Sequence, residues 1–370
     1  MTPNFQQRRI SLIHILKKNG LGAAAFVPGP NFYFLTGLKF SLMERPTLMF
    51  VTDSGDVLAI MPELEREMWS AAMGGATTFY WQDSDGFDKA FSDLAYELGT
   101  TKIGIEGQRM RAFELNALGA VFGSDTIIDA QAELAKPRLL KSDYEVKLIE
   151  KAIEISEISI SETLENIEAG MTEIAIRAIL MQRMLANGAD GFAFDIIVLT
   201  GGNAAKPHGI PGDTQLRPGA PLLIDFGATY QGYSADITRT VFCEHITDEH
   251  AEIYEAVLAA NIAGRQMAAP AITCHEIDVK VSNTLRKTGF DDLVVHKTGH
   301  GLGLDVHEAP NVMINNHTPL ESGMLITIEP GLYRSNDIGV RIEDDVLITD
   351  NDCRSLTKFK RSPIILRSAK

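Results

Sequence analysis

Residues 222–240 read LLIDFGATYQGYSADITRT and contain two strand-like segments, each of which carries a carboxylate. The first segment is apolar except for Asp225, and the last eight residues alternate, so that Asp236 and Thr238 share one face of a strand. A carboxylate inside an apolar strand costs free energy unless it is paired with a cation or bound to a metal ion. Asp225 and Asp236 are therefore candidate ligands.

Three later segments carry further ligand-type side chains. His300 stands between two glycines, where the backbone can approach a site closely. Glu329 ends an apolar strand, and a further strand places Arg341 and Glu343 on one face. A single carboxylate of this kind is usually capped or salt-bridged, but four in a strand-like context indicate a common site.

The charge of this set predicts a dinuclear metal site. Four carboxylates bring a charge of −4 and a neutral imidazole adds none, so two divalent ions would balance the set. Carboxylate-rich sites with one imidazole suit hard or borderline ions such as manganese, cobalt, iron or zinc. Two metal ions roughly 3.5–4 Å apart can bridge a hydroxide, which is a nucleophile at neutral pH. The sequence therefore indicates hydrolytic chemistry.

Histidines close to this set favour an active site. His296, His300 and His307 fall within twelve residues, and His208 lies in a loop rich in proline and glycine that fits an active-site rim. The HExxH motif of zinc peptidases begins at His307, but Asn311 stands where the second histidine would be. Neither a P-loop nor a GxSxG nucleophile motif occurs, which disfavours phosphate binding and an α/β-hydrolase.

The composition limits the class of protein. The 370 residues include 34 basic and 49 acidic side chains, a net charge of −15. At roughly 150 residues per domain, we expect two domains. The charge argues against a nucleic-acid or anionic-membrane partner, and no apolar run is long enough to span a membrane. The first twenty residues lack an unbroken apolar core, so we expect no signal peptide. Three widely spaced cysteines favour a reducing cytoplasm.

The pattern along the chain predicts an α/β N-terminal part followed by a helical junction. In residues 1–135, short apolar strands alternate with helical stretches, and a turn sequence at residues 53–56 predicts a hairpin. Ser142 and Glu145 form a capping box for a long helix that we expect to end near Gly170.

A weak internal repeat follows this helix. Thr172 and Gly188 bracket a second helical stretch, and Thr273 and Gly289 repeat this pair 101 residues later. The spacing suggests two duplicated halves.

The ordered motifs resemble the pita-bread metallopeptidases, and most of all their Xaa-Pro dipeptidase (prolidase) and aminopeptidase P members. Five stretches carry the resemblance: GGNAAKPHG, IDFGATYQGYSADITRT, HKTGHGLGLDVHEAP, TIEPGLY and GVRIED. PGPNFYFLTG and ERPTLMFV resemble the family's creatinase-type N-terminal domain more loosely. The resemblance implies an α+β fold class, with a pita-bread catalytic domain at residues 136–370 preceded by a smaller creatinase-type α/β domain at residues 1–135.

The resemblance also implies a role for each candidate ligand. Asp225 would chelate the first metal, and Asp236 and Glu343 would bridge both metals. His300 and Glu329 would hold the second metal, and Glu329 would also act as the general base.

The same resemblance implies a set of substrate contacts. His208 would contact the substrate on the prime side, and His307 would stabilise the tetrahedral intermediate. His296 would line the pocket, and Tyr333 and Arg341 would orient substrate or ligands.

The activity implied is hydrolysis of the Xaa-Pro bond in dipeptides or short proline-containing peptides by a metal-bridging hydroxide. This activity would need two divalent ions per subunit, with manganese as the first choice and cobalt, zinc or iron as alternatives. The resemblance also implies a homodimer. In some prolidases an arginine follows the HE-x-P segment and can help to read the carboxylate of a dipeptide, but here Asn311 follows Pro310. Dipeptidase and aminopeptidase P therefore both stay open, although the small N-terminal domain favours dipeptidase-sized members.

Two other functions are compatible with this fold. One is a pita-bread amide hydrolase that acts on a non-peptide small molecule. The other is a non-catalytic binding module, against which the complete set of five ligands argues.

Overall fold

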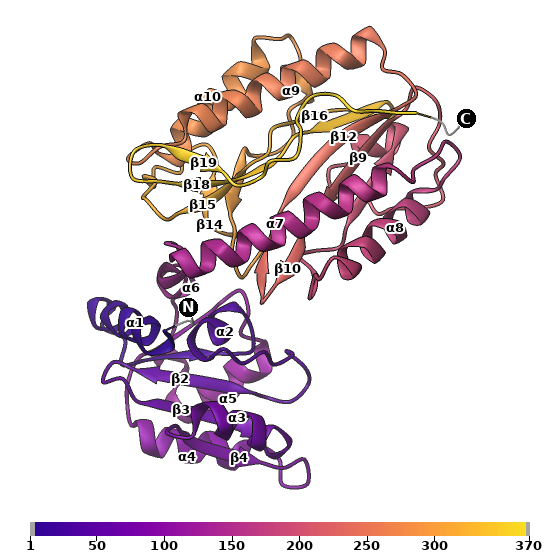
Figure 1. The fold of residues 1–370 in the computed structure, drawn as a ribbon. Coiled ribbons are helices and arrows are strands. Elements are labelled where there is room, and N and C mark those ends of the chain that lie inside the picture. Colours follow the sequence, from indigo (N-terminus) through magenta and orange to yellow (C-terminus); the bar gives the residue numbers. More distant parts are fainter. Residues whose placement is uncertain (1–3, 368–370) are drawn as a thin grey trace. The chain divides into compact units, whose positions relative to one another are not determined.

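A six-stranded mixed sheet forms the centre of residues 1–138 in the computed structural model, which describes residues 4–367 (Figure 1). In sheet order its strands are β4 (Thr77–Trp81), β3 (Val57–Pro62), β2 (Leu48–Thr52), β1 (Ala23–Phe26), β5 (Ile103–Ile105) and β6 (Ile127–Asp129). The helices are α1 (Phe5–Asn19), α2 (Pro30–Thr36), α3 (Arg66–Met73), α4 (Asp88–Leu98), α5 (Ala112–Phe122) and α6 (Gln131–Ala135). This is the expected α/β alternation.

The expected hairpin joins β2 and β3. The two strands are antiparallel neighbours, and Gly55 in the turn between them has a φ of 101°, which favours glycine. The Asp56 N–H donates to the Thr52 hydroxyl at 2.9 Å and closes the turn. Because β1, β2 and β3 are almost wholly apolar and buried, the hairpin lies within the core of this unit.

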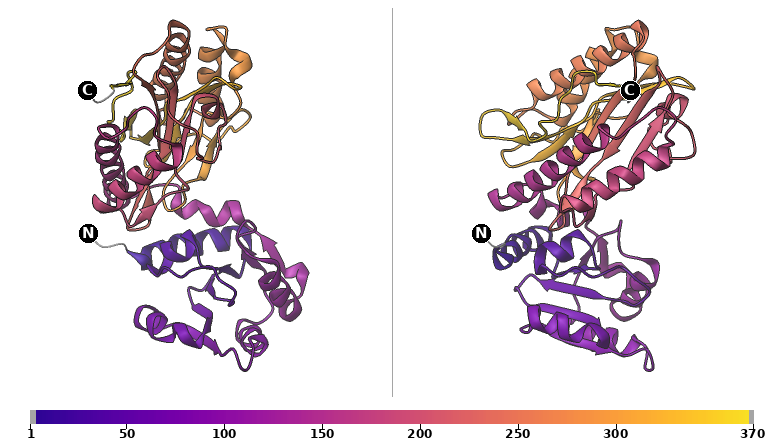
Figure 2. Two further views of the ribbon diagram at one scale, coloured as in Figure 1. Left: turned by 90° about the vertical axis from the view of Figure 1, so that its right-hand side faces the viewer. Right: turned by 45° about the vertical axis from the view of Figure 1, so that its right-hand side comes forward.

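Residues 139–370 enclose their strands between two pairs of helices. Helices α7 (Asp143–Leu164) and α8 (Glu173–Ala186) lie on one side, and α9 (Asp248–Met267) and α10 (Cys274–Arg286) lie on the other (Figures 1 and 2). The strands come first from the middle of the chain: β7 (Gly191–Phe192), β8 (Ile197–Thr200), β9 (Pro221–Phe226), β10 (Ala228–Tyr230), β11 (Tyr233–Ser234) and β12 (Ile237–Cys243). The later strands are β13 (Gly299–Gly301), β14 (Glu308–Val312), β15 (Leu325–Ile328), β16 (Gly331–Arg334), β17 (Ile338–Arg341), β18 (Asp344–Ile348), β19 (Cys353–Ser355) and β20 (Ile365–Leu366).

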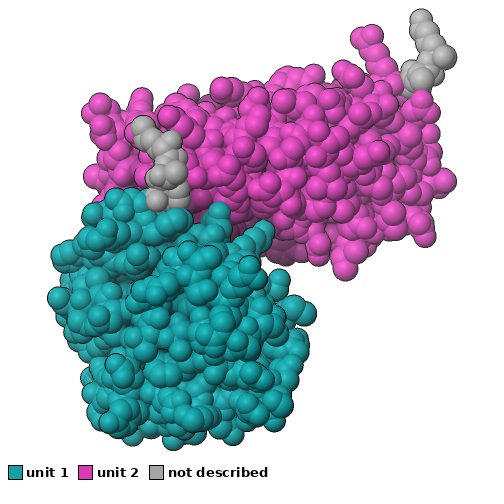
Figure 3. Space-filling view, turned by 60° about the horizontal axis from the view of Figure 1, so that its bottom comes forward, with its two compact units in different colours: residues 1–138 teal, residues 139–370 magenta. Residues whose placement is uncertain are grey.

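Two strand groups in this part carry the candidate ligands. One sheet has the order β20-β12-β9-β8, and another has the order β14-β13-β15-β18-β19. The first packs its apolar side chains with those of α7 and α8, and the second packs mainly with α9 and α10. The chain thus divides into two compact units, residues 1–138 and 139–370 (Figure 3), and the first unit has its own core around β1, β2 and β5.

Helix α7 begins as expected but ends earlier. Ser142 and Glu145 form the predicted capping box, with the Glu145 carboxylate accepting from the Ser142 N–H at 3.0 Å. The helix ends at Leu164 rather than near Gly170. The reason is local, because the Asn166 N–H bonds to the Thr163 carbonyl oxygen in a tight turn.

The two residue pairs of the internal repeat, Thr172 with Gly188 and Thr273 with Gly289, occupy the same positions relative to helices α8 and α10. Thr172 caps α8 and Thr273 caps α10, each with its side-chain oxygen. Gly188 and Gly289, which follow these helices, both have positive φ, 97° and 84°.

Within residues 4–367, no helix combines the length and the apolar composition needed to cross a membrane. Residues 5–19 of the segment that we expected not to be a signal peptide form α1, and residues 1–3 lie outside the described residues.

Candidate metal centre and active site

The five predicted ligands come from separate strands and line one cavity of about 650 Å³. Asp225 lies in β9, and Asp236 directly precedes β12. His300 is the central residue of β13, Glu329 follows β15, and Glu343 lies between β17 and β18. The structure therefore brings together five residues that are spread over residues 225–343 of the sequence.

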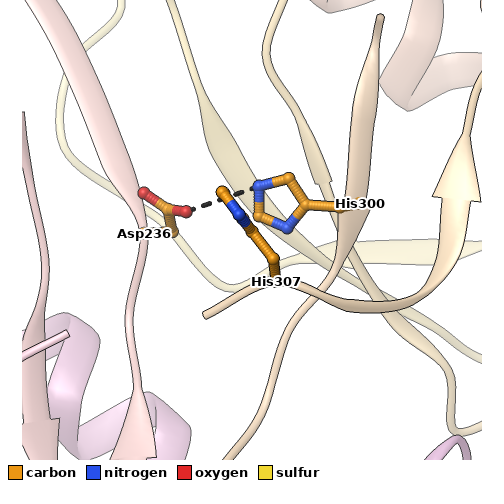
Figure 4. Close-up of side chains that lie close together, drawn as sticks. All are labelled: Asp236, His300 and His307. Carbon is orange, nitrogen blue, oxygen red and sulfur yellow. Dashed lines mark ion pairs between the residues drawn. The ribbon is translucent and has the colours of Figure 1, made fainter. Parts of the chain in front are cut away.

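The donor atoms form three overlapping groups, and within each group they lie within 4.8 Å of one another. The groups are Asp225–Asp236–Glu343, His300–Glu329–Glu343 and Asp236–His300–His307. His300 Nε2 lies 3.3 Å from Glu329 Oε1. It lies 3.6 Å from Asp236 Oδ2, and Figure 4 shows this pair beside His307. Glu343 belongs to the first and second groups and Asp236 to the first and third, so these two carboxylates are shared between groups.

The carboxylates of the first group are buried and repel one another. Burial, and then the charges of Glu343 and Asp225, raise the pKa of Asp236 well above its usual range. Burial and the charges of Glu329 and Asp225 do the same to the pKa of Glu343. Asp225 Oδ1 is buried without a hydrogen-bond partner among the described residues. A dense set of buried carboxylate oxygens fits hard or borderline divalent cations.

The pKa values of Glu329 and His307 are lowered rather than raised. Although burial acts to raise it, the hydrogen bond and charge of His300 lower the pKa of Glu329 to about 2, so this carboxylate is ionised. Burial and the neighbouring His300 lower the pKa of His307 to about 4. The His307 ring lies edge-on to that of His300, with the ring centroids 4.1 Å apart. At neutral pH, His307 is thus a neutral imidazole with one N–H to donate.

Arg341 connects the ligands to two predicted substrate-binding residues. Its guanidinium pairs with Asp225 and donates to the hydroxyls of Thr238 and Tyr333 at 2.9 and 2.7 Å. The Tyr333 hydroxyl also lies 2.9 Å from His296 Nε2. Arg341 and His296 line the cavity, whereas Tyr333 is buried behind them. Tyr333 is therefore placed to orient these two side chains rather than to contact a substrate.

Thr238 and Arg239 support the ligands from opposite faces of β12. Thr238 pairs opposite Asp225, and its hydroxyl donates to Glu343 Oε2 at 2.6 Å. Arg239 donates to the carbonyl oxygen of Glu343 at 2.6 Å and pairs with Asp344 at 2.8 Å. The sequence analysis gave Arg239 no role, although a charged residue on the apolar face of a strand is a signal that a buried partner exists.

A fully buried carboxylate holds the loop that carries His208. Glu173, the first residue of α8, accepts N–H groups from Thr200 at 2.8 Å and from Gly212 at 2.9 Å. It also accepts the Asn203 amide at 3.2 Å. These bonds fix both ends of residues 200–212, a segment within which His208 lines the cavity. The sequence analysis missed Glu173 because an acidic residue after an N-cap is ordinary helix chemistry.

Two cations on the cavity wall were also missed. Arg177 and Lys297 both line the cavity, although neither lies in a spacing that marks a ligand. Only the folded chain brings them next to the carboxylates.

Comparisons with known proteins cover both units. Residues 147–350 match the family model described as metallopeptidase family M24, and residues 8–140 match the creatinase/prolidase N-terminal domain. An Xaa-Pro dipeptidase of Pyrococcus horikoshii is 35% identical over 95% of this chain and 97% of its own length.

Two solved structures are similar over nearly the whole chain. A prolidase from Thermococcus sibiricus has a TM-score of 0.93 and 30% identity, covering 99% of this chain and 100% of the prolidase. An X-Pro aminopeptidase from Thermotoga maritima has a TM-score of 0.85 and 30% identity, covering 96% of this chain and 99% of the aminopeptidase.

Proposed function

Since this chain belongs to metallopeptidase family M24, and is a metallopeptidase with the expected pita-bread catalytic domain and creatinase-type N-terminal domain, we propose that it hydrolyses the Xaa-Pro bond of dipeptides. The observation that carries the proposal is the convergence of four carboxylates and one imidazole in one cavity. The names of the full-length relatives support the substrate class. An Xaa-Pro bond has no N–H, so its hydrolysis depends on activating the carbonyl and the nucleophile.

The proposed site holds two divalent ions, manganese first, on the five ligands Asp225, Asp236, His300, Glu329 and Glu343. Bound there, such ions polarise a carbonyl and lower the pKa of water. Glu329, with Oε1 3.3 Å from His300 Nε2, accepts a proton from the attacking water and delivers it to the departing proline nitrogen. The neutral His307 donates its N–H to the carbonyl oxygen as negative charge develops there.

The remaining wall of the cavity positions the substrate in this proposal. His208, on its anchored loop, contacts the prime side, and His296 and Arg341 line the pocket near the ligands. We also propose a homodimer, to be tested by light scattering. The free thiols of all three cysteines support a reducing compartment such as the cytoplasm.

Aminopeptidase P activity is the second candidate, favoured by the similarity to the Thermotoga maritima aminopeptidase and by the neutral Asn311. The deciding experiment measures turnover of an Xaa-Pro dipeptide and an Xaa-Pro-Yaa tripeptide side by side, with manganese added after EDTA treatment. Turnover of the dipeptide alone supports the proposal, and preference for the tripeptide supports aminopeptidase P. If neither is cleaved by protein that has taken up metal, the substrate is another amide.

A further inference from the structure

We propose that Lys297 binds the free carboxylate of a dipeptide substrate and thereby determines specificity for dipeptides. The inference rests on the proposed Xaa-Pro dipeptidase function. In an Xaa-Pro dipeptide, the carboxylate carbon is three bonds from the scissile carbonyl carbon, and with the φ of proline fixed near −65° it lies only about 3 Å away. A site that selects dipeptides therefore needs a cation close to the metal ligands. Because Asn311 is neutral, that cation must come from elsewhere on the wall.

Only a few cations are available on this wall. Among the described residues, the Lys and Arg side chains that line the cavity are Arg177, Lys297 and Arg341. Arg341 is already engaged, because it is buried and pairs with Asp225. Arg177 and Lys297 form no ion pair within residues 4–367, so their charges are open to a ligand.

The strand register places the Lys297 ammonium on the side of the ligands. Lys297 lies two residues before Gly299, where β13 begins, and its ammonium donates to Asn311 Oδ1. Asn311 pairs directly opposite His300 between β14 and β13. Directly opposed residues of antiparallel strands project from the same face and have Cα atoms about 4.5–5.5 Å apart. Asn311 therefore holds the ammonium on the face that carries the metal ligand His300.

The charges in the cavity support this orientation. The ligand side holds four of the carboxyl groups that line the cavity, whereas Lys297 is a cation on the same wall. Lys297 lies close enough to His307 for its charge to act on that imidazole, which is the proposed donor to the scissile carbonyl. An ammonium has three N–H donors, and one reaches Asn311, so the group can bind a carboxylate while it stays anchored.

The test compares an Xaa-Pro dipeptide with the corresponding Xaa-Pro amide, which has the same shape without the negative charge. In Lys297→Met, we expect the ratio of kcat/KM for the dipeptide to that for the amide to fall about 10- to 100-fold, chiefly through KM. Lys297→Arg should keep most of the ratio. Arg177→Gln, which removes the other unpaired cation, should keep the wild-type ratio. The proposal is overturned if the ratio survives in Lys297→Met or collapses in Arg177→Gln alone.

Asn311→Asp tests the same assignment without changing Lys297. The new carboxylate would compete for the ammonium, so the ratio should fall here too, and a wild-type ratio would contradict the anchoring role of Asn311. Calorimetry on the manganese-loaded protein separates this proposal from the proposed function. If the wild type cleaves neither compound but binds the dipeptide at least about tenfold more tightly than the amide, and Lys297→Met removes the difference, the function fails and the Lys297 assignment stands. Equal binding of the two compounds overturns the assignment.

Discussion

Lys141 and Glu308 form an ion pair in which Nζ and Oε1 lie 2.5 Å apart, although 167 residues separate them in the chain. Both side chains are almost fully buried, at 2% and 5% exposure. The pair joins the start of the second unit to the residue that follows His307. It therefore connects the stability of this unit with the placement of a proposed catalytic group.

Removing one charge of this pair should destabilise the second unit. Lys141→Met removes the ammonium that pairs with the buried Glu308 carboxylate, and breaking a buried ion pair in this way costs about 3–5 kcal/mol. We expect a lower urea midpoint by circular dichroism, since both tryptophans lie in the first unit. The double variant Lys141→Met/Glu308→Leu should recover most of the loss. A single variant as stable as the wild type would show that the pair contributes nothing.

Asp236→Asn or Glu343→Gln should abolish turnover and metal pairing while the fold persists. Each substitution removes a proposed bridging charge, so we expect activity to fall at least about a hundredfold. In metal-free protein the same change should raise the melting temperature, because it relieves repulsion among buried carboxylates. Metal analysis and thermal melting check both parts. Near wild-type turnover in either variant contradicts the dinuclear site.

His307→Ala separates two roles that the geometry allows. His307 forms a possible ligand group with Asp236 and His300, but we assign it to the developing oxyanion (Figure 4). If this is right, kcat falls about 10²–10³-fold while metal content stays at the wild-type level. Loss of metal from the variant, measured by plasma mass spectrometry, would make His307 a ligand instead.

Glu173→Gln should loosen the His208 loop. The amide that replaces one carboxylate oxygen turns N–H donors toward the N–H groups of Thr200 or Gly212. We expect faster proteolysis within residues 201–212 and a KM raised about tenfold, in line with the loss of a charge-assisted hydrogen bond. Glu168→Gln makes the same charge change at an exposed position and is the control. Equal proteolysis of the two variants argues against an anchoring role.

Chelation should lower the stability of the second unit. Without bound cations, the buried carboxylates repel one another, and a ligand that binds only the folded state raises stability with its concentration. EDTA should therefore lower the melting temperature, and manganese should restore it in the wild type but not in Asp236→Asn. If EDTA leaves the melting temperature of metal-containing protein unchanged, bound metal does not stabilise the second unit.

The ligands were predictable because each interrupts a local pattern. Asp225 breaks an apolar strand, and Asp236 and Thr238 share a face by alternation, which the β9–β12 register reproduces. The caps at Ser142 and Thr172 were predictable for the same reason, since a cap involves residues within one turn. A single sequence predicts such an interaction when the two partners lie close together along the chain.

Side chains with distant partners were not predictable. Nothing near Lys141 in the sequence predicts its ion pair, because Glu308 becomes its neighbour only in the fold. Glu173 resembles any acidic residue at the start of a helix, so its bond to Gly212 could not be predicted. Lys297 lies three residues from a predicted ligand, yet its relation to Asn311 depends on the pairing of β13 with β14. The end of α7 was misplaced because the turn at Asn166 stops the helix before the glycine that usually marks such an end.

The spread of the proposed ligands along residues 225–343 affects when the site can form during synthesis. During synthesis the N-terminal unit can fold first, but the chain has no complete ligand set until Glu343 has left the ribosome. The sheet that contains β12 is completed later still, when β20 pairs with Phe242 and Cys243 at the end of β12. A chain cut before Glu343 would lack one of the five proposed ligands, so we expect it to be inactive as a peptidase.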